Sequence, residues 1–226
     1  MEQDLSHPRL ASSLPEADRH NFYHVIHKAL RLGHCHILAA LGAHDFTREV
    51  ESRELMRRLR ELIGFGRVYL EAETRYIHAA LERRKPGASI RAAAHHRGNR
   101  QSFAEIESLI RAVEVAIASR RPLAGEALYR RYALFAATDM EHMHEEETEL
   151  LATLHATFTD DELIAIEDRI IGAITRGQMT TYVALMASAL NHAERARMLA
   201  KLKMAMPDMA FSEAPFGTTQ ATASIQ

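Results

Sequence analysis

Histidine and glutamate, two side chains that bind metal ions, recur in this sequence at spacings that suit a shared site. His142 and Glu146 are four residues apart, so on an α-helix they lie about 6 Å apart on one face and can hold a single ion. His27, Glu73 and His96 stand in three other segments of the chain. Histidine is also abundant, with 14 in 226 residues, and imidazole is the commonest metal ligand. These five residues predict a metal centre.

The two carboxylates indicate what such a centre needs. Glu73 and Glu146 fall on the apolar stripes of their segments, and an ionised carboxylate buried without a partner is costly. A cation held by carboxylates and neutral imidazoles removes that cost. Mixed nitrogen and oxygen ligands favour iron or manganese, with zinc as an alternative, whereas magnesium and calcium prefer oxygen alone.

Two further side chains stand one helical turn before predicted ligands. Tyr69 precedes Glu73 by four residues, and Asp139 precedes His142 by three. The ordinary pKa of a phenol, near 10, makes Tyr69 a poorer ligand than imidazole at neutral pH. We therefore expect Tyr69 to hydrogen-bond a water or Glu73. Asp139 is expected either to orient an imidazole or to be a sixth ligand.

Other histidines are predicted to lie away from the ion. His34 is about 10 Å, by helical rise, from the ligand in its own segment, so we expect a hydrogen-bonded core residue. His95 falls off the apolar stripe of its segment, which predicts a surface position. His78 follows Glu73 by five residues, roughly 140° around an α-helix, so a supporting or surface position is expected.

Long helices must position these residues. Ala, Leu, Glu and Arg dominate the chain, and the β-branched runs typical of strands are scarce. A capping box at Thr159 and Glu162 predicts a shorter helix to about residue 175. Another, at Asn191 and Glu194, predicts a helix that ends at Pro207. The predicted long helices cover about residues 19–42, 50–84, 90–119 and 125–156.

Short connections between the long helices predict an all-α fold, an up-down-up-down four-helix bundle with additional C-terminal helices. In such a bundle the start of an odd-numbered helix lies beside the end of an even-numbered one, so the five predicted ligands meet in one layer. The expected organisation is a polar leader (1–18), a metal-binding bundle (19–157), a helical extension packed on it (158–207) and a flexible tail (208–226).

Composition argues against several kinds of partner. Lys and Arg total 28 against 30 Asp and Glu, a net charge of -2, so there is no basic excess to bind a nucleic-acid backbone. No stretch approaches the roughly 18 apolar residues of a membrane span, and the first residues lack the apolar core of a signal peptide. One cysteine, Cys35, excludes an internal disulfide and fits a reducing compartment. We therefore expect a cytoplasmic protein.

Four segments carry the predicted ligands: IHKALR (26–31), EAETRYIHAALERRKPGA (71–88), AAAHHR (92–97) and DMEHMHEEETELL (139–151). Together they resemble bacterial hemerythrin-like proteins, the HHE cation-binding group, and LNHAERARMLAKL (190–202) resembles the C-terminal extension of one subgroup. The resemblance implies a hemerythrin-like four-helix bundle around a non-haem iron centre, usually with two irons. Members of the family carry, store or sense oxygen, iron, nitric oxide or redox state.

One departure from the family pattern concerns the number of ligands. The second helix of the family carries His-x-x-x-Glu, and here the pair reads Tyr69-x-x-x-Glu73. The third helix has Asn99 and Arg100 after His96, where the oxygen carriers have a second histidine. The resemblance thus implies a centre with one ion or with two weakly bound ions, and it disfavours oxygen carriage.

Three functions remain open on these observations. The first is a cytosolic iron-binding protein that senses or buffers metal, oxygen or redox state, with the metal ion and O2 or another small diatomic as partners. The second is an oxidase or peroxidase that uses Glu73 and Glu146 as ligands of a di-iron centre, although no second catalytic dyad or substrate-specific motif supports an enzyme. The third is a structural or adaptor bundle with a degenerate metal site, of which Tyr69 would be the sign.

Overall fold

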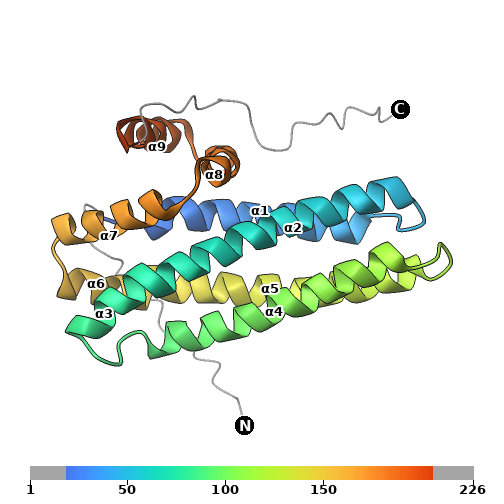
Figure 1. The fold of residues 1–226 in the computed structure, drawn as a ribbon, viewed down its shortest axis with the longest axis horizontal. Coiled ribbons are helices and arrows are strands. Elements are labelled where there is room, and N and C mark those ends of the chain that lie inside the picture. Colours follow the sequence, from blue (N-terminus) through green and yellow to red (C-terminus); the bar gives the residue numbers. More distant parts are fainter. Residues whose placement is uncertain (1–18, 206–226) are drawn as a thin grey trace, which may run out of the picture.

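The structure, a computed structural model, describes residues 19–205, and these residues form helices without a strand (Figure 1). The predicted all-α class is therefore confirmed. Two short segments, η1 and η2, are π-helical, which means that their backbone hydrogen bonds span five residues instead of four. In chain order the elements are α1 (Tyr23–Ala43), α2 (Glu49–Ala72), η1 (Glu73–His78), α3 (Ala79–Arg84), α4 (Ile90–Val115), α5 (Arg121–Glu145), η2 (Glu146–Leu150), α6 (Leu151–Thr157), α7 (Asp160–Ala173), α8 (Arg176–Ala189) and α9 (His192–Ala205).

Four long helical segments lie side by side and alternate in direction along the chain (Figure 1). The first is α1 and the third is α4, while the second runs through α2, η1 and α3 and the fourth through α5, η2 and α6. Both α1 and α4 contact α2 and α5. The predicted bounds of the long helices differ from those observed by a few residues.

Local sequence signals mark several of the helix ends. The turn between α3 and α4 contains Gly87, whose positive φ of 86° is accessible to glycine at little cost. The capping box predicted at Thr159 is present, with Glu162 bonding back to the Thr159 backbone. Asn191 and Glu194 exchange the same pair of hydrogen bonds at the start of α9.

Residues 176–189, for which the sequence predicts no helix, form α8. The start of α8 could have been predicted, because Thr175 and Gln178 form a third capping box. Among the C-terminal helices, α7 contacts η1 and α8 contacts α1, and all three lie on the side of α1 and α2 (Figure 1). The predicted leader (1–18), the tail (208–226) and the last two residues of the predicted extension lie outside the described residues.

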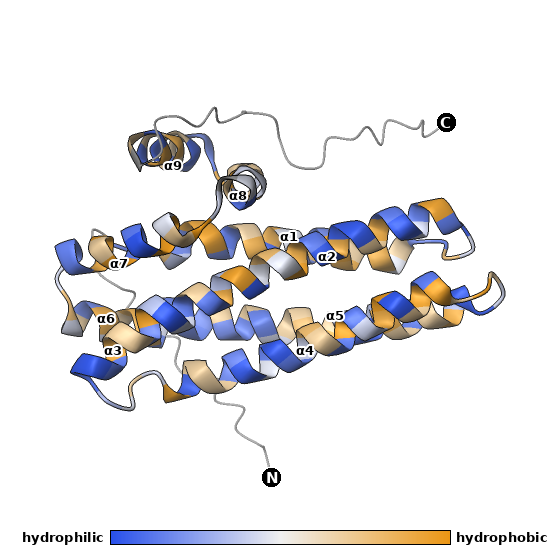
Figure 2. Cartoon of the chain, in the orientation of Figure 1, coloured by the Kyte–Doolittle hydropathy of each residue, from blue (hydrophilic) through white to orange (hydrophobic). Residues whose placement is uncertain are grey.

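Two apolar clusters fill the space between the four long segments, one at each side of a polar layer. The larger contains Leu30, Leu59 and Ile106, and the smaller contains Ile77 and Leu154. Each helix nevertheless carries hydrophilic residues along its length (Figure 2). None of the helices among residues 19–205 is both long and apolar enough to span a membrane.

Candidate metal centre

The structure brings the five predicted ligands together in the polar layer between the two apolar clusters. His27 comes from α1, His96 from α4 and His142 from α5. Glu73 is the first residue of η1, and Glu146 is the first residue of η2. All five side chains are buried, with at most 4% of each residue exposed.

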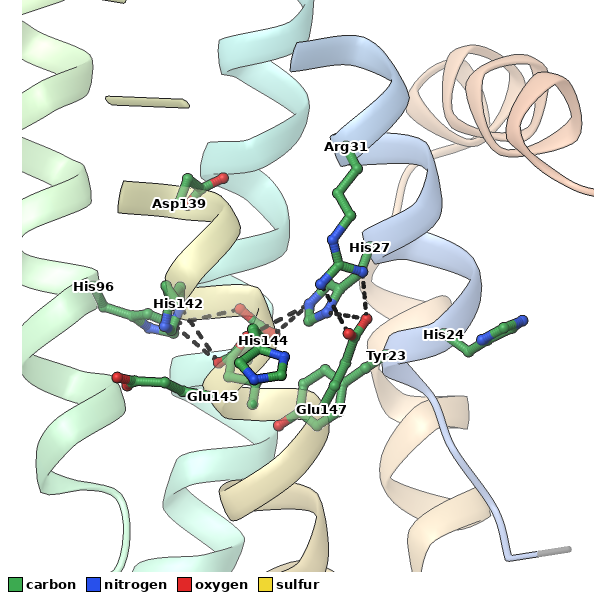
Figure 3. A network of polar contacts seen from close by, with 12 residues as sticks. Tyr23, His24, His27, Arg31, His96, Asp139, His142, His144, Glu145 and Glu147 are labelled. Carbon is green, nitrogen blue, oxygen red and sulfur yellow. Dashed lines mark hydrogen bonds and ion pairs between the residues drawn. The ribbon is translucent and has the colours of Figure 1, made fainter. Parts of the chain in front are cut away.

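The donor atoms of these residues converge on one another (Figure 3). The Nε2 atom of His96 lies 3.4 Å from Oε2 of Glu73 and 3.6 Å from Oε1 of Glu146. His142 Nε2 lies 3.4 Å from the same Glu146 oxygen. One donor atom from each of these four residues lies within 4.8 Å of the others. His27 Nε2 completes the group at 3.5 Å from Glu146 Oε2 and 4.0 Å from Glu73 Oε1.

Several donor atoms in this layer are buried without any hydrogen-bond partner. They include Nε2 of His27 and His96 and one carboxylate oxygen each of Glu73 and Glu146. A buried polar atom left unpaired costs about 1–3 kcal/mol, and a charged one costs more. The atoms are unpaired because they face one another across a small gap. A transition-metal ion accepts both imidazole nitrogen and carboxylate oxygen, so this donor set fits a cation.

His78 also faces the centre, which corrects the expectation of a supporting or surface position. It is buried, its ring stacks on that of His96 at 4.6 Å, and its Nε2 lies 4.0 Å from Oε1 of Glu146. The cause is η1, which begins at Glu73 and ends at His78. The wider π-turn brings residues five apart onto nearly the same face, whereas an α-helix would separate them by about 140°.

Glu147 and Arg31 hold His27 in place from behind. Oε1 of Glu147 lies 3.1 Å from Nδ1 of His27, and Arg31 bonds both oxygens of that carboxylate at 2.7 and 2.8 Å (Figure 3). These two partners lower the pKa of the Glu147 carboxyl to about 2 despite its burial. The ionised carboxylate accepts a hydrogen bond from Nδ1 of His27, which therefore carries a proton. The lone pair of Nε2 is then directed into the centre, the arrangement typical of a metal-binding histidine.

Thr74 fixes His96 in the same way. The Thr74 hydroxyl donates to the backbone carbonyl of Leu70 at 2.9 Å, so its oxygen can accept a hydrogen bond from Nδ1 of His96, 2.8 Å away. Nδ1 therefore keeps its proton, and Nε2 is the nitrogen that faces the centre. Nothing in the sequence indicated the roles of Arg31 and Thr74, because their partners lie on other elements or other turns. For Glu147 the sequence predicted a solvated or supporting charge, and the supporting position is the one observed.

Asp139 belongs to a neighbouring hydrogen-bonded network. Its two oxygens accept from Nε2 of His34 at 2.9 Å and from the Asn99 amide at 2.6 Å. His34 also bonds the Tyr132 hydroxyl at 2.9 Å through Nδ1, so the prediction of a hydrogen-bonded core histidine is confirmed. Because both Asp139 oxygens are engaged, Asp139 orients its neighbours rather than offering a free ligand atom.

Two tyrosines border the centre. The ring of Tyr69 stands edge-on to His27 at 5.8 Å, and the ring of Tyr23 stacks on the same imidazole at 5.1 Å. Both hydroxyl oxygens are buried without a hydrogen-bond partner. Burial, and then the charges of Glu73 and Glu146, raise the pKa of both phenols well above the ordinary value. Tyr69 is therefore a neutral phenol beside the carboxylates.

Burial and mutual contact set the charges within the centre. Burial alone lowers the pKa of His96, but contacts with Glu146 and Glu73 outweigh it and raise that pKa to about 9. The pKa of Glu73 is lowered despite burial, chiefly because of His96. Burial and the charge of Glu73 raise the pKa of Glu146 well above its ordinary value. Burial lowers the pKa of His142 to about 4, so this imidazole is neutral and ready to bind a cation.

A cavity of about 130 Å³ runs from the surface to the centre. Its inner wall includes His142 and Glu146, and its outer wall includes Arg91, Glu145 and Glu149. Arg91, on α4, crosses to the neighbouring helical segment, where it bonds Glu149 at 2.7 Å and also pairs with Glu145. The side chains of Arg91 and Glu149 are more than 60% exposed, so these ion pairs lie across the mouth of the cavity.

His95 is a partly buried neighbour of Glu145 and His142. Its side chain is 26% exposed, and its Nε2 is 3.1 Å from Oε2 of Glu145. The ring stacks on that of His142 at 5.2 Å. The predicted surface position of His95 is therefore correct only in part, because the side chain is partly buried. His95 points to Glu145, whereas His96 points to the buried Glu73 and Glu146.

Comparisons of the chain with protein-family models, with curated proteins and with solved structures gave no match.

Proposed function

We propose that the protein binds transition-metal ions, iron in the first place, in the buried layer formed by His27, Glu73, His96, His142 and Glu146. The observation that carries this proposal is the set of buried nitrogen and oxygen atoms that face one another without hydrogen-bond partners. The supporting bonds behind His27 and His96, which turn Nε2 of each ring inward, add to it.

The addition of His78 bears on how many ions are held. With it the layer offers four imidazoles and two carboxylates. The resemblance to hemerythrin-like proteins led us to expect a shortage of ligands, because Tyr69 stands where the family has histidine. We propose that His78 supplies this imidazole from the other side of Glu73, and that the four long segments form a hemerythrin-like bundle around two ions.

We propose further that the protein senses or buffers iron, oxygen or redox state. Iron would supply one-electron chemistry and affinity for small diatomic molecules. A cavity of about 20 Å³ adjoins Glu73, His142 and Glu146, and such a space holds one molecule of about the size of water. A centre with room for one small molecule suits sensing or buffering better than turnover of an organic substrate.

Metal analysis of protein purified without metal and then titrated anaerobically with Fe(II) tests this function. We expect the wild type to bind up to two ions per chain and Glu146→Gln to bind fewer than half as many. Glu141→Gln is the matched control, because Glu141 lies one turn away on the exposed face. A wild type that retains no metal would instead support a structural or adaptor bundle. Peroxide turnover that is lost in Glu146→Gln would support an oxidase or peroxidase.

The ion pairs of Arg91 are expected to control how fast metal enters and leaves. Arg91→Gln should raise the rates of Fe(II) loading and of removal by a chelator about 3- to 10-fold, since exposed ion pairs are worth roughly 0–1 kcal/mol each. The affinity should not change, because Arg91 does not reach the buried layer. Stopped-flow absorbance measures both rates, with Arg111→Gln, an exposed arginine paired within its own helix, as control. Rates equal to those of the wild type would mean that metal enters by another route.

A further inference from the structure

A second and larger cavity lies between α1 and α2 and the three C-terminal helices. It has a volume of about 280 Å³ and is lined by side chains of α1, α2, α7, α8 and α9. Most of its walls are aliphatic or thioether groups, among them Ile26, Val68, Ile171, Met186 and Met198. The C-terminal helices therefore form one side of an apolar cavity as well as packing on the long segments.

An apolar space of this size favours an apolar occupant. Water gains little in it, because a buried water needs two to four polar partners. Ile26, Val68 and Met186 face the cavity and stay only partly buried, so apolar surface remains to be covered. At about 30 Å³ for each water-sized group, the cavity accommodates roughly nine such groups, the length of a medium alkyl chain.

The polar residues at the rim indicate the head group of that occupant. Glu167 pairs with both Lys201 and His20. Glu194 likewise bonds Lys28 and His24, each at 2.8 Å. These contacts keep both carboxylates ionised, and for Glu194 they lower the pKa to about 2. Both acids at the rim are thus already neutralised by cations of the protein itself.

Arg197 is the cation at the rim that remains free. It lines the cavity and is exposed, and within residues 19–205 no ion pair involves it. Its guanidinium offers a planar pair of donors that matches a carboxylate. A single unpaired cation beside an apolar cavity suits a molecule with one anionic head and an apolar body.

Tyr69 separates this cavity from the candidate metal centre. It lines the apolar cavity and also the 20 Å³ space beside Glu73 and Glu146. An occupant of the larger cavity would therefore end against the residue that borders the metal ligands, although its binding does not depend on a metal.

We propose that this cavity binds a medium-chain monocarboxylate, with the alkyl chain inside and the carboxylate on Arg197. The full chain is titrated in a calorimeter with decanoate below its critical micelle concentration and with decanol below its solubility limit. The wild type should bind both compounds. Arg197→Ala should weaken the binding of decanoate about tenfold and leave that of decanol unchanged, since only decanoate carries a charge that Arg197 can pair with. Arg169→Ala, an exposed arginine outside this cavity, is the matched control and should change neither.

Cavity-filling variants test the apolar part of the proposal. Val68→Phe should weaken decanoate and decanol alike by tenfold or more, and the milder Ala72→Leu serves if Val68→Phe alters the helical circular dichroism. Hexanoate should bind more weakly than decanoate because it covers less apolar surface. Absence of decanoate binding, or equal binding to the wild type and to both filled variants, overturns the proposal. Equal effects of Arg197→Ala on acid and alcohol would overturn the role of Arg197 as the carboxylate partner.

Discussion

Replacing His96 by alanine should remove most of the metal, whereas the same replacement at the adjacent His95 should leave the metal content unchanged. His96 is fully buried, and its Nε2 lies 3.4 Å from Glu73 and 3.6 Å from Glu146. His95 is partly exposed and directs its Nε2 to Glu145 instead. Since residues that merely support metal ligands are worth about 10- to 100-fold in affinity, loss of His96 should cost more than about 100-fold.

The two variants form a matched pair, because they remove the same side chain from neighbouring positions on α4. Fe(II) or Zn(II) titration, followed by elemental analysis after gel filtration, measures the difference. Circular dichroism of the metal-free variants establishes that both remain helical. If His95→Ala lost the metal and His96→Ala retained it, α4 would have to be rotated by one residue, and the proposed ligand set would be wrong.

Removing the metal should lower the melting temperature by about 10 °C. The reference is protein in a free metal concentration of roughly 1,000 times the dissociation constant. Binding at that excess adds about 4 kcal/mol to the free energy of unfolding, and 1 kcal/mol shifts the melting temperature of a domain of this size by about 2–4 °C. The physical reason is that Glu73 and Glu146 face each other in a buried layer. Without a cation, only partial protonation relieves their repulsion.

The same experiment has a definite pH dependence. In the metal-free protein the pKa of His96 is raised to about 9 and that of Glu146 is raised as well. A group whose pKa is raised in the folded state stabilises the protein at pH values below its pKa in the unfolded state. This contribution is lost as the pH rises through its pKa in the folded state. The metal-free protein should therefore lose stability between about pH 6.5 and 9. His142, with a pKa of about 4, stays neutral over this range.

Metal binding requires the proton to leave His96, so affinity rises over the same interval. The difference in melting temperature between metal-bound and metal-free protein should accordingly be larger at pH 9 than at pH 6.5, as differential scanning calorimetry can measure. Equal melting temperatures with and without metal at both pH values would mean that the cation does not contribute to folding.

The layer of candidate metal ligands was predictable because it depends only on regular features of helices. His27, Glu73, His96, His142 and Glu146 fall on apolar stripes, and alternating helix direction brings the starts and ends of neighbouring helices to one level. Neither step needs the details of packing. The predicted convergence of these residues therefore agrees with their observed positions.

His78 was misjudged because the prediction assumed a continuous α-helix through Glu73. The sequence does carry a trace of the interruption, since the apolar stripe of residues 50–84 continues equally well through Tyr76 or Ile77. A change of phase in an apolar stripe is a sign of a π-turn, and such turns are frequent at functional sites. The contact of Thr74 with His96 depends on the same local geometry, so it too was out of reach of a fixed helical period.

The apolar cavity beside α8 and α9 was unpredictable for a different reason. It exists because three C-terminal helices stand against α1 and α2 at particular angles, and those angles depend on packing between residues far apart in sequence. The free guanidinium of Arg197 becomes informative only when Glu167 and Glu194 are seen to be paired with other cations. Composition and spacing contain neither fact.

The two π-turns determine which residues of their segments face the candidate metal centre. Each adds one residue to its helix, so every side chain beyond it is turned by about 100° relative to an uninterrupted α-helix. Deleting a single residue between Glu73 and His78 would place His78 four positions after Glu73, the spacing that an ordinary α-turn brings onto one face, so His78 and Leu81 would keep their directions. A one-residue deletion within η1 or η2 should therefore be absorbed as a return to the α-helix, whereas the same deletion in an α-helical stretch just before either of them would rotate the residues on one side of it by about 100° relative to those on the other.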